Sequence, residues 1–148
     1  MDILSKVPER LKELMFDKEI NAPALAKVLG VGSNTITRYL QGVSSPKFEI
    51  FVKLIEYFHC SADFLLGLAD YPQYETNFAP VLPFETAFRR ALATYDISQY
   101  ALQKATNISW ANFHFWLNGL RRPYLDSLVS LAQNIDCSVD YLLGRTDF

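Results

Sequence analysis

Apolar positions recur along this chain with the spacing of α-helices, and no segment shows the two-residue alternation that is typical of a strand. The start of the chain illustrates the pattern, because its apolar side chains fall on one helical stripe at Leu4, Val7, Leu11, Leu14 and Met15. Glycines and prolines separate such stretches. The pattern predicts five helices in the first part of the chain, at residues 5–17, 22–29, 33–41, 46–58 and 62–66.

Residues 20–42 hold the most informative pair of predicted helices. Gly30 and Gly32 flank Val31 between them, and glycine allows one helix to stop and another to begin at a steep angle. The apolar residues expected to face one another across this corner are Leu25, Leu29, Val31, Ile36 and Tyr39. The residues expected to point outward from the second helix are Ser33, Asn34, Thr37 and Arg38.

Capping residues support several of these limits. Asn21 and Ser61 stand immediately before predicted helices, where their side chains can accept a hydrogen bond from a backbone N–H. Pro8 and Pro23 fall in first turns, where proline is tolerated. Ser45 followed by Pro46 predicts that the fourth helix begins at this point.

The same pattern returns 77 residues later without a gap. The closing segments of the two copies, C-S-A-D-F-L-L-G and C-S-V-D-Y-L-L-G, are nearly identical. The second copy is therefore predicted to form helices at residues 84–95, 99–106, 110–118, 124–135 and 139–143. The expected organisation is a first domain at residues 1–68, a linker at 69–82 and a second domain at 83–148.

The predicted linker contains prolines and shows no helical period. Its Tyr71, Tyr74, Phe78 and Val81 are too apolar for a solvated tether, so we expect parts of it to lie against one or both domains. The second copy ends at Asp147, and we expect any regulation to act through abundance, oligomerisation or a partner.

Composition bounds the class of protein. At 148 residues, half of them apolar, the chain is long enough for one ordinary domain or two small ones. No apolar run approaches the ~20 residues that span a bilayer, and the first residues do not resemble a secretion signal. Cys60 and Cys137 belong to no CxxC pair and fit a reducing compartment. We therefore expect a globular cytoplasmic protein without a membrane partner.

The distribution of charge is more informative than its sum. The net charge of −2 argues weakly against a nucleic-acid partner. However, residues 21–47 contain no acidic side chain but include Lys27, Arg38 and Lys47. Residues 97–125 also lack acidic side chains and include Lys104, Arg121 and Arg122. Positive potential is thus confined to two windows, and each window contains a predicted helix corner.

Both copies carry a recognisable motif. The first has Leu25-Ala26, Gly30-Val31, Thr35-Ile36-Thr37-Arg38-Tyr39, Gly42 and Pro46, and the second has Gln99, Leu102, Ile108-Ser109, Trp116, Gly119 and Pro123. Each copy resembles the Cro/repressor-type helix-turn-helix domain of the XRE family. This resemblance implies an all-α fold of two tandem five-helix, lambda-repressor-like domains joined by the proline- and aromatic-containing linker.

The resemblance also implies a cytoplasmic transcriptional regulator that binds double-stranded DNA with the third helix of each domain. The side-chain chemistry agrees, because short hydroxyls, amides and guanidinium groups suit base edges and phosphates. The predicted base-reading residues are Ser33, Asn34, Thr37 and Arg38. The predicted phosphate anchors are Lys27, Gln41, Lys47, Gln99, Arg121 and Arg122. We expect either a homodimer or an intramolecular pseudo-dimer.

The copies depart from the family pattern in different places. Ala22 and Pro23 stand where the family often has a phosphate-contacting Gln, whereas the second copy keeps it as Gln99. The third helix of the second copy is expected to point Trp110, Ala111, His114 and Phe115 outward. Two explanations remain for this face. Either Trp110, His114 and Phe115 form a protein contact, or they meet DNA while Arg121 and Arg122 hold its backbone.

No nucleophile with a base, phosphate-cradling glycine loop or carboxylate pair stands out. His59 and His114 have no partners at metal-ligand spacing. We therefore expect no enzymatic activity, no cofactor, no metal and no small-molecule ligand. The alternative to a DNA-binding regulator is a protein-interaction module, antitoxin-like or regulator-binding, that uses the aromatic face of the second domain.

Overall fold

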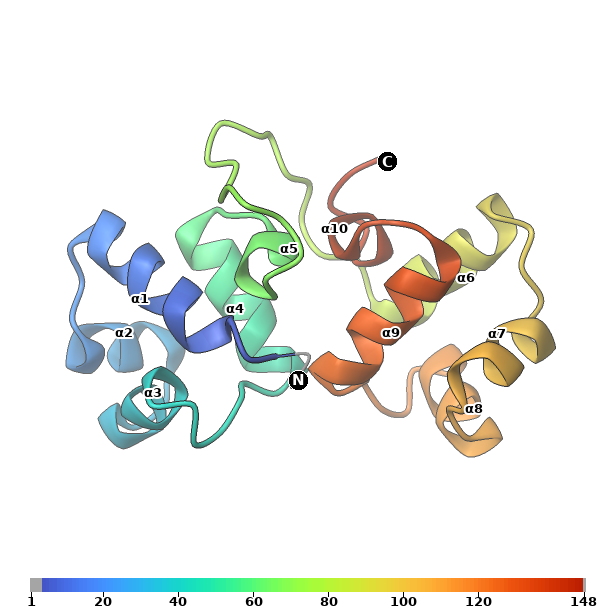
Figure 1. Ribbon diagram of the computed structural model, residues 1–148, viewed down its shortest axis with the longest axis horizontal. Coiled ribbons are helices and arrows are strands. Elements are labelled where there is room, and N and C mark those ends of the chain that lie inside the picture. Colours follow the sequence, from blue (N-terminus) through green and yellow to red (C-terminus); the bar gives the residue numbers. More distant parts are fainter. Residues whose placement is uncertain (1–3, 148) are drawn as a thin grey trace. The chain divides into compact units, whose positions relative to one another are not determined.

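The computed structural model describes residues 4–147, and this part of the chain contains ten α-helices and no strand (Figure 1). The prediction of an all-α chain with two five-helix copies is confirmed. The chain divides into two compact units, the first ending at Thr76 and the second beginning at Asn77. The outer ends of the predicted domains, residues 1–3 and 148, lie outside the described residues.

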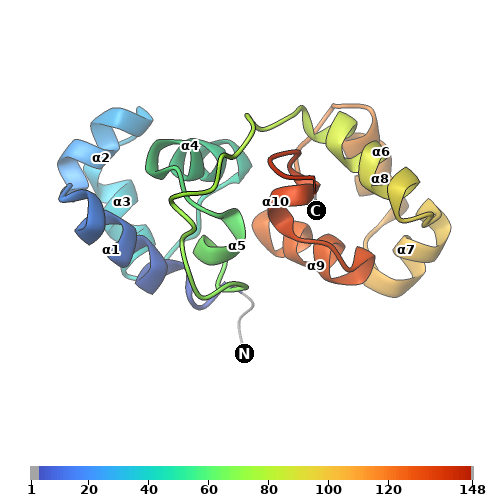
Figure 2. The ribbon, with the colours of Figure 1, turned by 90° about the horizontal axis from the view of Figure 1, so that it is seen from above.

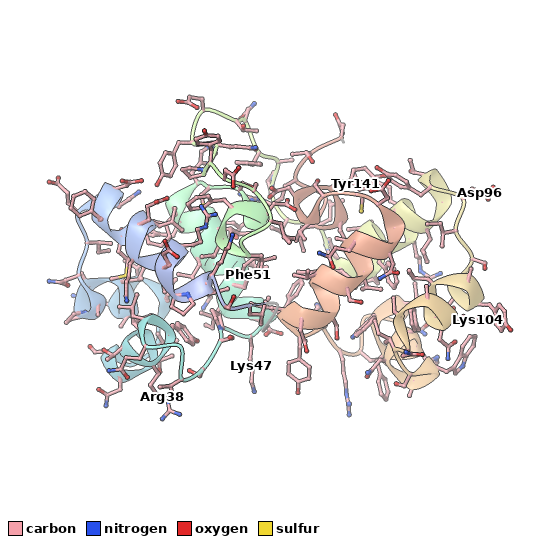
Figure 3. The ribbon with its side chains drawn as sticks, in the orientation of Figure 1. Arg38, Lys47, Phe51, Asp96, Lys104 and Tyr141 are labelled. Carbon is pink, nitrogen blue, oxygen red and sulfur yellow. The ribbon has the colours of Figure 1, made fainter. Side chains whose placement is uncertain are left out.

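The first unit comprises α1 (Val7–Lys18), α2 (Ala22–Leu29), α3 (Ser33–Leu40), α4 (Phe48–Phe58) and α5 (Ala62–Leu65). Helix α1 contacts α3 and α5, while α2 contacts α3 and α4. Phe51, on α4, is fully buried in this unit (Figure 3). The apolar stripes predicted from the sequence therefore meet in one core, and the polar face of α3 remains outside.

The second unit comprises α6 (Phe84–Thr94), α7 (Gln99–Thr106), α8 (Trp110–Leu117), α9 (Leu125–Ile135) and α10 (Val139–Leu142). Its contacts repeat the scheme of the first unit, with α6 against α8 and α10, and α7 against α8 and α9 (Figure 2). Its core is more aromatic. Phe88 lies 6.0 Å from Phe113 and 6.4 Å from Trp116, measured between ring centroids.

Helix limits agree with the sequence pattern to within about two residues, and the largest corrections are that α1 and α4 each begin two residues later than predicted. Helix α4 begins at Phe48, not at Pro46, and Ser45 does not cap it. Pro46 is buried in an extended segment, so the chain turns into the helix only after Lys47, whose backbone is still extended at φ −76° and ψ 168°. The predicted caps Asn21 and Ser61 are confirmed, since they accept hydrogen bonds from Ala24 N and Phe64 N.

Residues 69–76 of the predicted linker pack against the first unit. The backbone N–H of Ser61 donates to Pro72 O at 2.7 Å. The Tyr74 hydroxyl donates to Asp17 Oδ2 at 2.7 Å. Burial and this hydrogen bond raise the pKa of Tyr74 above its ordinary value of 10.0. The segment is therefore attached to α1 and to the turn before α5.

Residues 77–82 pack against the second unit instead. Ala79 N donates to Arg145 O at 2.9 Å, and the Phe78 ring lies under the Arg145 guanidinium, 4.1 Å from its Cζ. Arg145 also forms an ion pair of 2.6 Å with Asp140, and both side chains are almost completely buried. Arg145 thus ties the turn after α10 both to Asp140 within α10 and to Phe78 and Ala79 at the start of the unit. At the equivalent place in the first unit, 77 residues earlier, the arginine is replaced by Leu68.

Replacing Asp140 with Asn should lower the stability of the second unit by about 3–5 kcal/mol, because the charge of Arg145 would stay buried without its counter-ion. Urea unfolding followed by tryptophan fluorescence measures this directly, since both tryptophans lie in the second unit. Asp63→Asn, at the equivalent position of the first unit, should leave the tryptophan transition unchanged. An unchanged transition for Asp140→Asn would show that the ion pair does not stabilise the unit.

The first unit should lose stability as the pH rises above about 10. The folded unit favours the neutral phenol of Tyr74. The contribution of this group to the free energy of unfolding is therefore complete below the ordinary tyrosine pKa of 10.0, and it disappears as the pH rises and the phenol ionises in the folded unit. Urea midpoints from circular dichroism between pH 9 and pH 11 should fall less steeply for Tyr74→Phe than for the wild type. Tyr71→Phe, at a side chain 75% exposed, should behave as the wild type. Equal slopes for all three proteins would contradict the prediction.

Candidate nucleic-acid interface

The corner between α2 and α3 determines how α3 is presented. Gly30 ends α2 in the left-handed region at φ 72°, and Val31 N donates back to Ala26 O at 3.0 Å. Such a conformation is easiest for glycine. Ile36 and Tyr39 of α3 are then buried at 0% and 6% exposure. Because these residues lie one turn apart, the opposite face of α3 must point to solvent.

All four predicted base-reading residues lie on that exposed face: Ser33, Asn34, Thr37 and Arg38. The Thr37 hydroxyl donates to Ser33 O at 3.2 Å, so its oxygen keeps its acceptor capacity toward solvent. Gln41 follows α3 and is also exposed. Arg38 and Lys47 point away from the core on the same side of the first unit (Figure 3). The predicted exposure of Ser33, Asn34, Thr37 and Arg38 is therefore confirmed, and their role in binding stays a prediction.

A surface hollow of about 540 Å³ lies between α3 and the segment leading into α4. Its lining residues are Asn34, Thr35, Arg38, Tyr39, Ser44, Ser45, Lys47 and Ile50. It combines two cations with hydroxyl and amide groups, which is the chemistry that phosphates and base edges require. Burial raises the pKa of the Tyr39 phenol above its ordinary value of 10.0.

Three predicted site residues come together at this hollow, namely Asn34, Arg38 and Lys47. Lys27, in the last turn of α2, is exposed but does not line it. Ser44 and Ser45 line it and were not predicted as site residues. They lie in a loop, where no periodicity indicates which way a side chain points. The only feature of the sequence that could have marked them as site residues is their position between Gly42 and Pro46, in the window without acidic residues.

The second unit builds the same corner with different residues. Asn107 ends α7 in the left-handed region at φ 59°, where the first unit uses glycine. Ser109 caps α8 by accepting from Asn112 N at 3.2 Å. Phe113 and Trp116 are buried at 0% and 3% exposure, which confirms them as the core equivalents of Ile36 and Tyr39.

The outward face of α8 differs from the expectation at one residue. Trp110 is 59% exposed and His114 is exposed, as predicted. Phe115 is only partly exposed, because the Arg121 guanidinium lies over its ring with Cζ 4.3 Å from the ring centroid. The chain returns over α8 after Gly119, and Leu120 N donates to Phe115 O at 2.9 Å. The expected exposed Trp–Phe pair is therefore one exposed indole and one ring that carries a cation.

The predicted phosphate anchors of the second unit differ in how far their side chains are exposed and in the hydrogen bonds that they already form. Arg121 is exposed, whereas Arg122 is partly buried and donates from Nη1 to Gly119 O at 3.2 Å. Gln99, at the start of α7, is also partly buried. Asn118 Nδ2 donates to His114 O at 2.8 Å and lies 3.3 Å from His114 Nδ1. Of the three predicted anchors of this unit, Arg121 is the one that is exposed.

Comparison with family models identifies both corners. Residues 24–65 match a model described as helix-turn-helix, and residues 87–147 match one described as the Cro/C1-type HTH DNA-binding domain. The chain is thus a tandem helix-turn-helix protein. One match falls in each unit, and the two together support a tandem helix-turn-helix arrangement of the XRE type. Comparisons with curated proteins and with solved structures found no match.

Two further properties of the described residues bear on the site. Within residues 4–147 there is no group of three or more His, Cys, Asp or Glu side chains that could hold a metal ion. None of the helices in this part of the chain has both the length and the hydrophobicity to span a bilayer.

Proposed function

We propose that this protein is a sequence-specific transcriptional regulator that reads the DNA major groove mainly with α3. The hollow beside α3 is the observation that carries the proposal, because it joins exposed Asn34 and Arg38 to Lys47 at one place. An α-helix of about 10–12 Å diameter fits a major groove about 12 Å wide. Nothing acidic in residues 21–47 opposes a polyanion there.

The exposed side chains of α3 divide into two roles by chemistry. Asn34 carries an amide that suits the edge of adenine, and Arg38 carries a guanidinium that suits guanine or a phosphate. The hydroxyls of Ser33 and Thr37 can pair with either kind of base edge. Together they provide the directional hydrogen bonds that sequence recognition needs.

The phosphate anchors surround these base readers. Lys47 lines the hollow with Ser44 and Ser45, whose hydroxyls can donate to phosphate oxygens. Lys27 and Gln41 are exposed and available to the backbone on either side. In the second unit, Gln99, Arg121 and Arg122 were expected to anchor a flanking duplex phosphate, and Gln99 and Arg122 are kept in that proposed role. The protein contact expected of Trp110, His114 and Phe115 is untested, and it is one of the outcomes that the experiments on α8 below distinguish.

Arg38→Ala should weaken binding to a selected duplex by about 1–3 kcal/mol and relax discrimination at one base pair, because a bidentate contact is lost. Lys47→Ala should weaken binding to all duplexes similarly and reduce the slope of log affinity against log salt by about one. Fluorescence anisotropy with duplexes selected from a random pool measures both effects.

Lys18→Ala is the matched control, because this lysine lies over the Tyr57 ring with Nζ 4.6 Å from the ring centroid and does not line the hollow. It should leave affinity and salt slope unchanged. The proposal fails if the wild-type chain binds no duplex, or if its affinity for duplexes does not depend on salt.

We expect the operator to bind two chains. A second half-site needs a second copy of α3, because α8 lacks the polar groups with which α3 can read base edges. Half-sites read by two copies of α3 should then be related by a two-fold axis and lie about 34 Å apart, or a multiple of this. The mass of the complex from light scattering, together with the symmetry of the selected sequences, tests this expectation. One chain per duplex would instead indicate an intramolecular pseudo-dimer.

A further inference from the structure

The outward face of α8 offers little to the base edges of a duplex. Where α3 has Ser33, Asn34, Thr37 and Arg38, the equivalent positions of α8 hold Trp110, Ala111, His114 and Phe115. The imidazole of His114 is already within hydrogen-bond distance of the Asn118 amide. A helix of this composition is therefore poorly suited to the directional readout proposed for α3.

The same face nevertheless keeps a cation at a matching place. Phe115 occupies the position of Arg38, and Arg121 from the following loop lies over the Phe115 ring at 4.3 Å. Stacking on an aromatic ring restrains the guanidinium and leaves its other face and its edge toward solvent. The second unit thus also has a positive charge on this side of α8, but the charge comes from the loop after the helix and not from the helix itself.

The surroundings favour a polyanion over a protein as the occupant. Residues 97–125 contain no acidic side chain, although they form two helices and two loops. Exposed aromatic residues occur among the cations of this window: Tyr100 is 71% exposed, Trp110 59% and Tyr124 69%. Aromatic side chains interleaved with basic ones are typical of surfaces that bind unpaired nucleotides, because every base has a π-face that can stack.

We propose that Trp110, Phe115 and Arg121, here called the aromatic-arginine face, bind single-stranded nucleic acid. An unpaired base stacks on the indole of Trp110, and Arg121 holds a neighbouring phosphate or base. Bases within a duplex are covered by their neighbours, so the aromatic-arginine face prefers strands that are unpaired. This binding is independent of duplex reading by α3, and the two units then serve two forms of nucleic acid.

Tryptophan fluorescence of the full chain provides the test, because Trp110 is exposed and the other tryptophan, Trp116, is 3% exposed. Oligothymidylate and oligouridylate of about 20 nucleotides serve as probes, since neither forms a duplex with itself. At least one should quench the emission, and a blunt duplex of the same length should quench it less. Trp110→Ala should weaken binding of the quenching strand, measured by anisotropy, by about 5- to 150-fold.

Trp110→Tyr should retain most of the affinity, because tyrosine also stacks, and it guards against a folding defect in Trp110→Ala. Arg121→Ala should weaken binding and reduce its salt dependence. Phe16→Ala removes an aromatic ring that is 82% exposed in the first unit and should change nothing. Arg38→Ala should weaken duplex binding alone, so a failure of the proposed function can be distinguished from a failure of this inference.

Three results would overturn the proposal. In the first, neither single strand binds or quenches. In the second, the duplex quenches Trp110 as strongly and competes with the single strand, which would make α8 a second duplex reader. In the third, Trp110→Ala changes the mass of the protein in solution but not its affinity for the single strand, which would make this face a protein contact.

Discussion

The orientation of α3 and of α8 depends in each case on two buried side chains one turn apart. Ile36 and Tyr39 fix α3, and Phe113 and Trp116 fix α8. Residues three apart in the sequence lie on one face of a helix. The helix can therefore bury both members of such a pair in only one rotational setting about its own axis. Every exposed group on α3 and α8 follows from this constraint, so the core determines which side chains of these helices face solvent.

The two units show how far one fold can serve different chemistry. Their helices pack in the same scheme, and both use a left-handed residue at the corner, Gly30 in one and Asn107 in the other. The exposed faces share almost nothing, since α3 carries hydroxyl, amide and guanidinium groups while α8 carries an indole and a phenyl ring under a guanidinium. Fold and function are separable here, because the packing scheme uses only the buried half of each helix.

Most of the fold could be predicted from the sequence, because helical spacing, caps and the 77-residue repeat agree with one another. The start of α4 could not, since the serine and proline before it match a common helix start but Pro46 is instead buried in an extended segment. The exposed side chains of α3 were also predictable from periodicity, and so were those of α8 with the exception of Phe115, which Arg121 covers. Ser44 and Ser45 were missed, because the direction of a loop side chain depends on what the loop packs against.

By itself, the sequence determined that there are two copies of one helical unit, which helix faces are buried and where acidic residues are missing. These properties are encoded locally, in the spacing of apolar residues and in composition. Only the tertiary structure decided that Arg121 lies on Phe115, that Lys47 lies beside Asn34 and Arg38, and how the segments on either side of Thr76 divide between the units. Such contacts join residues through loops, and loop paths follow from packing rather than from any repeat in the sequence.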